Sequence, residues 1–153
     1  MYSLDKQLQQ DTVLLGQFPL CDVLLMNDSQ YPWVILVPRR ASIRESYHLS
    51  QEEQHQLSDE SAYVSQRLAD FFEAVSMNVA ALGNVVSQLH VHHVVRFSDD
   101  PTWPKPVWGA LPAKPYEKPA LAKLVDDLTR VLNDKLVEDA TTSDGNSDDS
   151  DLY

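Results

Sequence analysis

The sequence predicts an α+β fold, in which an antiparallel sheet of about five strands carries a long helix and a C-terminal helix. Three observations predict it. Three β-capable runs stand in series before residue 39, a run with helical periodicity follows residue 50, and two more strand-like runs lie within 76–97. The chain has 153 residues, enough for one compact domain with a sizeable core. We expect that domain to span 1–137.

The first three strands are predicted at residues 12–18, 21–27 and 33–38, which are rich in aliphatic and β-branched side chains. Pro19 and Leu20 separate the first two, and a turn-forming run of Asn, Asp, Ser and Pro separates the second from the third. Pro38 ends the third run. Strands in series with short connections favour an antiparallel meander.

The long helix is predicted to start at Ser50, because Ser50 and Glu53 have the spacing of a capping box. Apolar side chains then recur at helical spacing from Leu57 to Val75, opposite a polar face of Gln, Glu and Asp. A helix with one apolar stripe buries that stripe. We therefore expect it to cover one face of the sheet.

Two further strands are predicted at 76–82 and 88–97, with Gly83 and Asn84 as a two-residue turn between them. The segment 99–119 is rich in proline, which excludes long regular structure, and its Trp103 and Trp108 favour packing at the edge of the core over a free linker. A last amphipathic helix is predicted from about residue 119 to 137.

The acidic charge gathers at the end of the chain. The formal net charge is −11, and six acidic residues but no basic one follow Lys135. Residues 138–153 are rich in Ser and Asp and poor in apolar side chains, so we expect a disordered acidic tail there. The negative charge disfavours nonspecific binding to nucleic acid or to an anionic membrane.

The N-terminal sequence, the lengths of the apolar runs and the cysteine content predict the compartment and the membrane association. Its N-terminus has no basic stretch followed by an apolar core, and no apolar run is long enough to cross a bilayer. The single cysteine, Cys21, cannot form an internal disulfide and is expected to be a small buried residue. These features predict a cytoplasmic protein without a membrane partner.

The chemistry-bearing side chains cluster in the run 88–93, Gln-Leu-His-Val-His-His. On a strand, Gln88, His90 and His92 share one face, while His93 takes the other. An imidazole can act as a nucleophile near neutral pH, and a neighbouring imidazole can donate to an anionic phosphate oxygen. From spacing alone, two alternatives stay open: a metal-binding histidine pair, which would need further ligands, and a solvated polar strand face.

Residues 77–96 resemble the signature of the histidine triad (HIT) family, in which histidine and apolar residues alternate after a glycine-containing turn. The resemblance extends upstream to 27–38 and downstream to 100–109, where the sequence is similar to a bacterial branch of the family. It covers about two-thirds of the chain, and it is most specific at the histidine strand.

This resemblance implies an enzyme, either a hydrolase or a nucleotidyltransferase, that acts at the α-phosphate of a nucleotide and requires no metal or other cofactor. His90 would attack the phosphorus and form a nucleotidyl-histidine, and His92 would donate to the phosphate oxygens. The backbone carbonyl of Gln88 would hold the other ring nitrogen of His90. Relatives of this family are commonly homodimers, so we expect a homodimer here.

The family pattern also implies contacts outside the two histidines. Phosphate-binding positions match Gln88, Asn78 and Asn84, and the ribose-binding position matches Asn27. Three positions depart from the pattern: Gln88 replaces the first histidine, Trp33 replaces an additional histidine, and Val85 replaces a serine. His93 is expected to pack in the core or at a dimer interface. Two other functions stay open: a nucleotide-binding regulatory module with little turnover, and a metal-binding protein that uses the histidine cluster.

Overall fold

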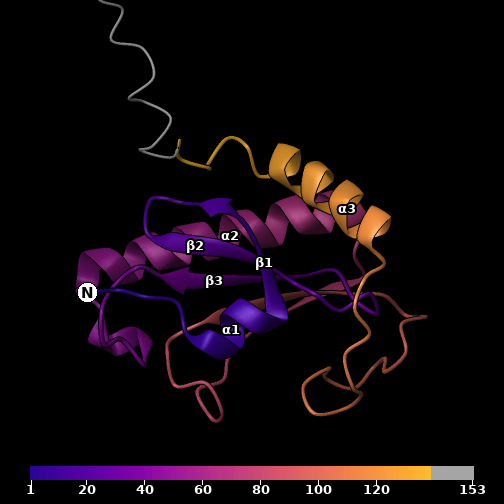
Figure 1. Cartoon of the computed structure of the whole chain (residues 1–153), viewed down its shortest axis with the longest axis horizontal. Coiled ribbons are helices and arrows are strands. Elements are labelled where there is room, and N and C mark those ends of the chain that lie inside the picture. Colours follow the sequence, from indigo (N-terminus) through magenta and orange to yellow (C-terminus); the bar gives the residue numbers. More distant parts are fainter. Residues whose placement is uncertain (139–153) are drawn as a thin grey trace, which may run out of the picture.

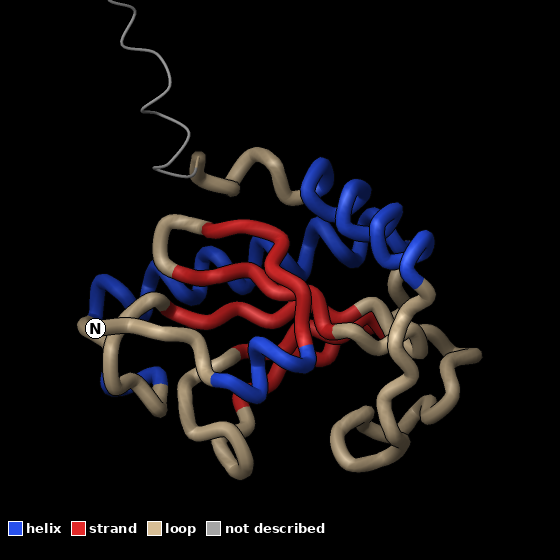
Figure 2. Tube along the Cα trace, viewed as in Figure 1, coloured by secondary structure: helices blue, strands red, loops and turns tan. Residues whose placement is uncertain are grey.

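The computed structural model describes residues 1–138 and confirms the α+β prediction. Its one five-stranded sheet has the order β1-β2-β3-β5-β4, and all neighbouring strands are antiparallel. The strands lie in the centre of the molecule with helices on both sides (Figures 1 and 2). Their bounds are β1 Thr12–Gln17, β2 Cys21–Met26, β3 Trp33–Pro38, β4 Ser76–Ala81 and β5 Val91–Arg96. The tail prediction lies, from residue 139 onward, outside the described residues.

The long helix α2, Gln51–Phe72, begins where the sequence predicts. The Ser50 hydroxyl accepts from the Glu53 backbone N–H at 3.1 Å, and the Glu53 carboxylate accepts from the Ser50 N–H at 2.9 Å. The capping box is therefore confirmed. A short 3-10 helix, Ser46–His48, lies just before α2.

The C-terminal helix α3, Lys118–Val131, is shorter than predicted. After it, the chain turns and runs against β1: the Val137 N–H donates to the Gln17 carbonyl at 2.8 Å, and Leu136 lies against Gly16. A Cβ on Gly16 would lie 2.9 Å from a methyl carbon of Leu136, so a larger residue at this position would require the Leu136 side chain to shift. The end of the described chain is thus attached to the edge of the sheet.

The sequence gives no prediction of the first helix, α1, Lys6–Asp11. It has six residues and one buried apolar side chain, Leu8, so it shows no helical periodicity. Asp5 caps it by accepting from the Gln7 N–H at 2.8 Å.

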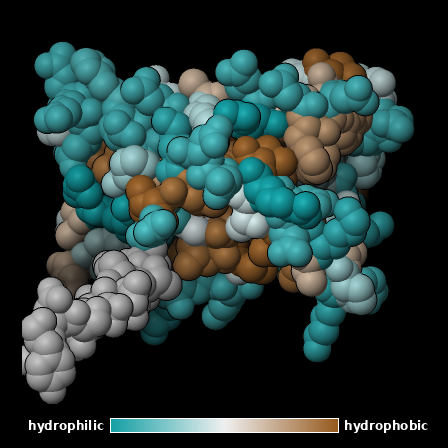
Figure 3. All heavy atoms as spheres, turned by 90° about the horizontal axis from the view of Figure 1, so that it is seen from above, coloured by the Kyte–Doolittle hydropathy of each residue, from teal (hydrophilic) through white to brown (hydrophobic). Residues whose placement is uncertain are grey.

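The two faces of the sheet bury two separate apolar clusters. Figure 1 shows α2 behind the sheet and α1 in front of it. On the α2 side, Leu57 and Val64 of α2 and Leu128 of α3 pack with strand residues, whereas on the α1 side Leu8 packs with Ile35 and its neighbours. Strands β2 and β3 are therefore covered on both faces, and their sequences are continuously apolar rather than alternating. Seen from above, most of the surface is hydrophilic, with hydrophobic atoms in separate patches (Figure 3).

The predicted two-residue turn at Gly83 and Asn84 is wrong. β4 ends at Ala81 and β5 begins at Val91, so residues 82–90 form a long connection. The strand predicted at 88–97 starts three residues later because the Leu89 N–H donates to the Ile43 carbonyl outside the sheet, at 2.9 Å. No helix in the described part of the chain is long and apolar enough to cross a membrane.

Candidate active site

The two candidate histidines lie at the start of β5. Leu89 is buried in the α2-side core, and its backbone hydrogen bond to Ile43 fixes the chain just before the strand. His90 lies in this segment, one residue before β5, and His92 lies within β5 opposite Ile35 of β3. The anchored connection therefore presents His90, and the sheet presents His92, on the side that carries α1.

The His90 ring is oriented by the backbone, as the sequence predicts. Its Nδ1 lies 2.7 Å from the carbonyl oxygen of Gln88. A carbonyl oxygen only accepts, so Nδ1 carries the proton, and the lone pair of the neutral ring lies on Nε2. His90 is 5% exposed and lines the cavity described below. Its Nε2 is therefore available as a nucleophile.

The Nδ1 of His92 accepts a hydrogen bond, whereas the Nδ1 of His90 donates one. The ring centroid of His92 lies 4.9 Å from that of His90, and its Nδ1 accepts a hydrogen bond from the Trp33 indole N–H at 2.9 Å. Burial lowers the pKa of His92 to about 3, and the nearby His90 and His93 add to this effect. His92 is therefore neutral near physiological pH.

Both histidines line a cavity of about 540 Å³ on the α1 side of the sheet. Most of its wall is aliphatic or aromatic, and the polar side chains are few. Such a cavity fits a ligand with an apolar part and a polar or anionic group that hydrogen-bonds to the imidazoles. Besides the two histidines and Asn84, the lining residues are Gln7, Leu8, Asp11, Met26, Ile35, Leu82, Val85, Val86, Trp108 and Gly109.

Of the six residues predicted for the site, the structure brings three to this cavity: His90, His92 and Asn84. Gln88 supplies its carbonyl to His90, but its side chain points elsewhere. The Gln88 amide donates to the Ser3 carbonyl at 2.9 Å and accepts from the Asp5 N–H at 2.9 Å. The Gln88 side chain thus holds the N-terminal segment in this structure, and its phosphate-binding role stays a prediction.

Asn78 and Asn27 are not among the residues that line the cavity. The Asn78 side-chain oxygen accepts from the guanidinium of Arg96 at 2.8 Å, in a buried network completed by Asp100. The Asn27 side-chain oxygen accepts from the Tyr116 N–H at 2.9 Å. Both amides bind protein groups in this structure, and the phosphate-binding role of Asn78 and the ribose-binding role of Asn27 stay predictions.

His93 packs in the core, as predicted. It is fully buried on the α2 side, where its Nε2 lies 2.7 Å from the Ser61 hydroxyl and its Nδ1 lies 3.2 Å from the Val34 carbonyl. Burial lowers the pKa of His93 to about 4, against the opposing effect of its backbone hydrogen bonds. Within residues 1–138, no group of three or more His, Cys, Asp or Glu side chains could hold a metal ion.

Sequence reasoning missed the α1 residues of the cavity and underestimated Trp108. The periodicity gave no signal for α1, so Gln7, Leu8 and Asp11 could not be assigned to the site. Trp108 was assigned to the edge of the core, and it instead packs on His92, with ring centroids 5.5 Å apart. Trp103 has the structural role predicted, since its ring lies over the Arg96 guanidinium.

Comparisons with known proteins agree with this geometry. A family model described as the HIT domain matches residues 7–99. A histidine triad protein from Marinobacter aquaeolei VT8 is 49% identical, with a TM-score of 0.86, and the match covers 88% of this chain and 98% of that one. A histidine triad protein from Sinorhizobium meliloti 1021 is 38% identical, with a TM-score of 0.82, covering 89% of this chain and 98% of that one.

More distant structures share the fold. A hypothetical histidine triad nucleotide-binding protein from Sulfolobus tokodaii strain 7 is 16% identical, with a TM-score of 0.61, and the match covers 80% of this chain and 85% of that one. A search of curated proteins gave no match. The family model spans more than half of the chain, and the two bacterial structures match almost their whole length. This chain belongs to the histidine triad family.

Proposed function

We propose that this protein is a nucleotide hydrolase or nucleotidyltransferase that acts at the α-phosphate through a covalent intermediate on His90. Membership of the histidine triad family implies nucleotide-binding hydrolase or transferase activity in general terms. The observation that supports a covalent intermediate on His90 is the pair of hydrogen bonds that determine which ring nitrogen carries the proton in His90 and in His92. The lone pair of His90 is on Nε2, and the Nδ1 of His92 is an acceptor, which leaves the His92 proton on Nε2.

The chemistry proceeds in two displacements. In the first, His90 Nε2 attacks the α-phosphorus, an N–P bond forms, and the bond from phosphorus to the leaving group breaks with its electron pair on that group. The His92 Nε2–H donates to a nonbridging oxygen as negative charge builds there. In the second, water or another acceptor attacks the phosphorus and releases its proton to solvent, and the N–P bond breaks with its electron pair returned to Nε2 of His90. The substrate class is a nucleoside phosphoramidate or a nucleoside polyphosphate.

The test is to trap and map the intermediate with a labelled nucleoside phosphoramidate. We expect wild type to carry an acid-labile, base-stable adduct on His90, and His90→Ala to carry none. His92→Ala should still label His90, with turnover slowed by roughly 10²–10³-fold, because one charge-stabilising donor is lost. His55→Ala, at an exposed position of α2 outside the cavity, is the matched control and should behave as wild type.

Specific outcomes would overturn this assignment. They are an adduct on His92 or His93, or full turnover by His90→Ala. Nucleotide binding by wild type without turnover would favour the regulatory binding module instead. Stoichiometric metal in the purified protein, together with loss of that metal in His90→Ala and His92→Ala, would favour the metal-binding alternative.

We also propose that the protein works as a cytoplasmic homodimer. The family resemblance supports the dimer, and so does the position of β4 at an edge of the sheet, where Val79 is 48% exposed. The single buried cysteine, Cys21, supports a reducing compartment. Sedimentation at micromolar concentration should give a mass near twice 17.3 kDa. A stable monomer with full activity would contradict the dimer.

A further inference from the structure

The hydrogen bond between Trp33 and His92 determines which ring nitrogen of His92 carries the proton. Trp33 Nε1 lies 2.9 Å from His92 Nδ1, and both side chains are buried, at 6% and 8% exposed. An indole N–H only donates, so His92 Nδ1 must accept and cannot carry a proton while this bond exists. The one proton of the neutral imidazole then lies on Nε2.

Protonation of both ring nitrogens would be unfavourable here. It would place an Nδ1–H against the indole N–H in a buried position, and the lost hydrogen bond would have no replacement. The titratable side chains around His92 are His90 on the same face, His93 of the same strand, which faces α2, and Asp11 of α1, which lines the same cavity. The Asp11 carboxylate accepts from the Gln7 side-chain amide and makes no hydrogen bond to His92, so it does not hold an imidazolium in place. Trp33 and burial therefore act together to keep His92 neutral.

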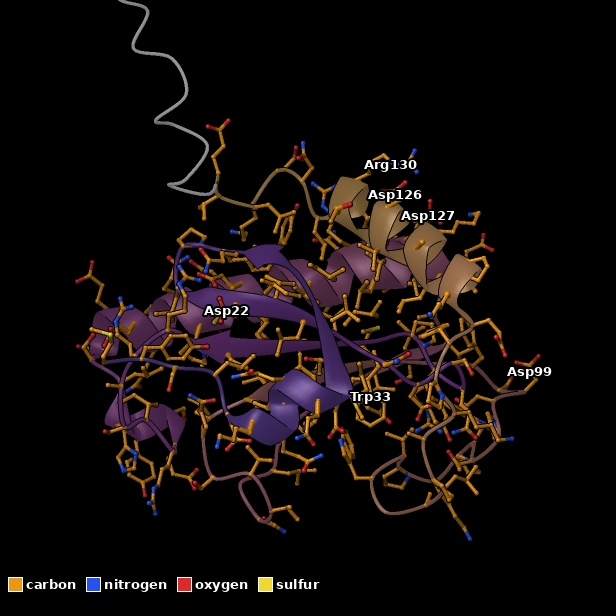
Figure 4. All side chains as sticks on the ribbon, viewed as in Figure 1. Asp22, Trp33, Asp99, Asp126, Asp127 and Arg130 are labelled. Carbon is orange, nitrogen blue, oxygen red and sulfur yellow. The ribbon has the colours of Figure 1, made fainter. Side chains whose placement is uncertain are left out.

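The indole is itself held in place by the sheet and by aromatic neighbours. Trp33 pairs with Val94 and Ile35 pairs with His92, so Trp33 and His92 are diagonal neighbours on the same face. The rings of Tyr31 and Trp108 pack on the indole with centroids 6.4 and 6.3 Å away. Trp33 lies on the side of the sheet that carries α1 (Figure 4).

We propose that Trp33 is a positioning residue that fixes His92 as the Nε2–H tautomer, so that His92 meets the substrate phosphate only as a neutral hydrogen-bond donor. No described residue bonds to His92 Nε2, and His92 lines the cavity, so this N–H is free for a ligand. The reading of His92 as a donor rests on the proposed function. The tautomer itself does not, because it is a property of the ligand-free protein.

The direct test is the ¹⁵N NMR spectrum of His92 in the ligand-free protein. In wild type we expect a single neutral Nε2–H tautomer from about pH 5 to pH 8, with no titration in that range. Trp33→Phe removes the N–H donor, so the Nδ1–H tautomer should become populated, while burial keeps the ring neutral over this range. Trp108→Phe is the matched control, since Trp108 also packs on His92 but makes no hydrogen bond to it. Its tautomer should match wild type.

Trp33→Phe leaves space in a buried site, so a second variant isolates the N–H. Benzothienylalanine, placed site-specifically at position 33, has the shape of tryptophan with sulfur in place of the N–H group. We expect this variant to show the same tautomer change. Its turnover should fall by roughly fivefold to tenfold, mainly in kcat, as for the loss of one hydrogen bond, with the adduct still on His90.

The outcomes separate this inference from the proposed function. A wild-type spectrum with the Nδ1–H tautomer, or an unchanged single Nε2–H tautomer in the benzothienylalanine variant, would overturn the role of Trp33. If the tautomer changes as expected but no adduct forms on His90 in wild type, the positioning of His92 stands and the proposed reaction fails.

Discussion

Glu60 lies on the buried side of α2, with none of its surface exposed. Its carboxylate accepts from the backbone N–H groups of Leu20 and Cys21, at 2.9 and 3.0 Å, and from the Gln56 side-chain amide at 2.7 Å. It thereby satisfies two backbone donors at the start of β2 that face the core. One buried carboxylate fixes the position of α2 against the turn between β1 and β2.

Replacement of this carboxylate should destabilise the fold. In Glu60→Gln an NH₂ group replaces one acceptor oxygen and faces a donor, so we expect the free energy of unfolding to fall by about 1–3 kcal/mol. Denaturant unfolding measures it. The control is Asp59→Asn, on the exposed side of the same helix, which should change stability by less than about 0.5 kcal/mol. Equal stability of the two variants would contradict the role given to Glu60.

The spacing of apolar residues in α2 places Glu60 on the buried side of the helix, although a glutamate is usually exposed. Glu60 stands three residues after Leu57 and four before Val64, so it lies on the apolar stripe of α2. A charged side chain would be expected on the polar face, but the partners of this carboxylate include backbone groups some forty residues away. Spacing identified the buried side of the helix, but only the fold reveals which donors a buried carboxylate satisfies.

At the scale of elements, Gln88 links the connection 82–90 to α1. Its carbonyl orients His90, and its amide group holds the backbone of Ser3 and Asp5 immediately before α1. α1 in turn supplies Leu8 and two polar side chains to the cavity. The residue that replaces the first histidine of the family pattern thus positions both His90, the proposed nucleophile, and one wall of the cavity.

This arrangement predicts the kinetics of Gln88→Ala. The substitution keeps the backbone carbonyl that orients His90 and deletes both hydrogen bonds to the N-terminal segment. We expect KM to rise about fivefold, as for one or two lost hydrogen bonds, while kcat stays within about twofold. The effect should be milder than that of either histidine change. Gln66→Ala, at an exposed position of α2, is the control. A large fall in kcat with unchanged KM would contradict this account.

The elements differ in how far the sequence could predict them. The strands and α2 follow from apolar runs, a capping box and a long stripe, all of which are local signals. α1 and the connection 82–90 could not be predicted, because tertiary hydrogen bonds at Gln88 and Leu89 fix them. The predicted site residues differ in the same way. The local spacing of the histidines identified His90 and His92, whereas the hydrogen bond from Arg96 to Asn78 is a tertiary contact that the sequence does not reveal.

At the scale of the whole molecule, the charged side chains that are buried, such as Glu60, Arg96 and Asp100, have hydrogen-bonding partners. The buried imidazoles of His92 and His93 are neutral near physiological pH. Asp126, Asp127 and Arg130 lie on the outer side of α3 (Figure 4), where exposed ion pairs such as that between Asp127 and Lys123 contribute little to stability. The buried histidines matter more to the pH dependence, because burial penalises their charged forms.

The stability of the protein should therefore fall as the pH falls below about 6.5, the ordinary pKa of an unfolded histidine. In the folded protein the pKa is lowered to about 3 for His92 and to about 4 for His93. Between these values and 6.5, the unfolded chain binds protons that the folded chain does not, so protonation favours unfolding. The stabilisation is complete above about pH 6.5 and is lost progressively toward the folded pKa values.

His93→Gln tests which residues cause this dependence, since an amide can still accept from Ser61 and donate to the Val34 carbonyl but does not titrate in this range. Denaturant unfolding at several pH values between about 4 and 8 gives the slope of stability against pH, which counts the protons taken up on unfolding. The variant should have a shallower slope below about pH 6.5 than wild type, by up to one proton, whatever its absolute stability. His55→Ala removes an exposed histidine of α2 and should leave the slope unchanged. An equal slope in His93→Gln and wild type would show that groups other than this buried imidazole determine the acid sensitivity.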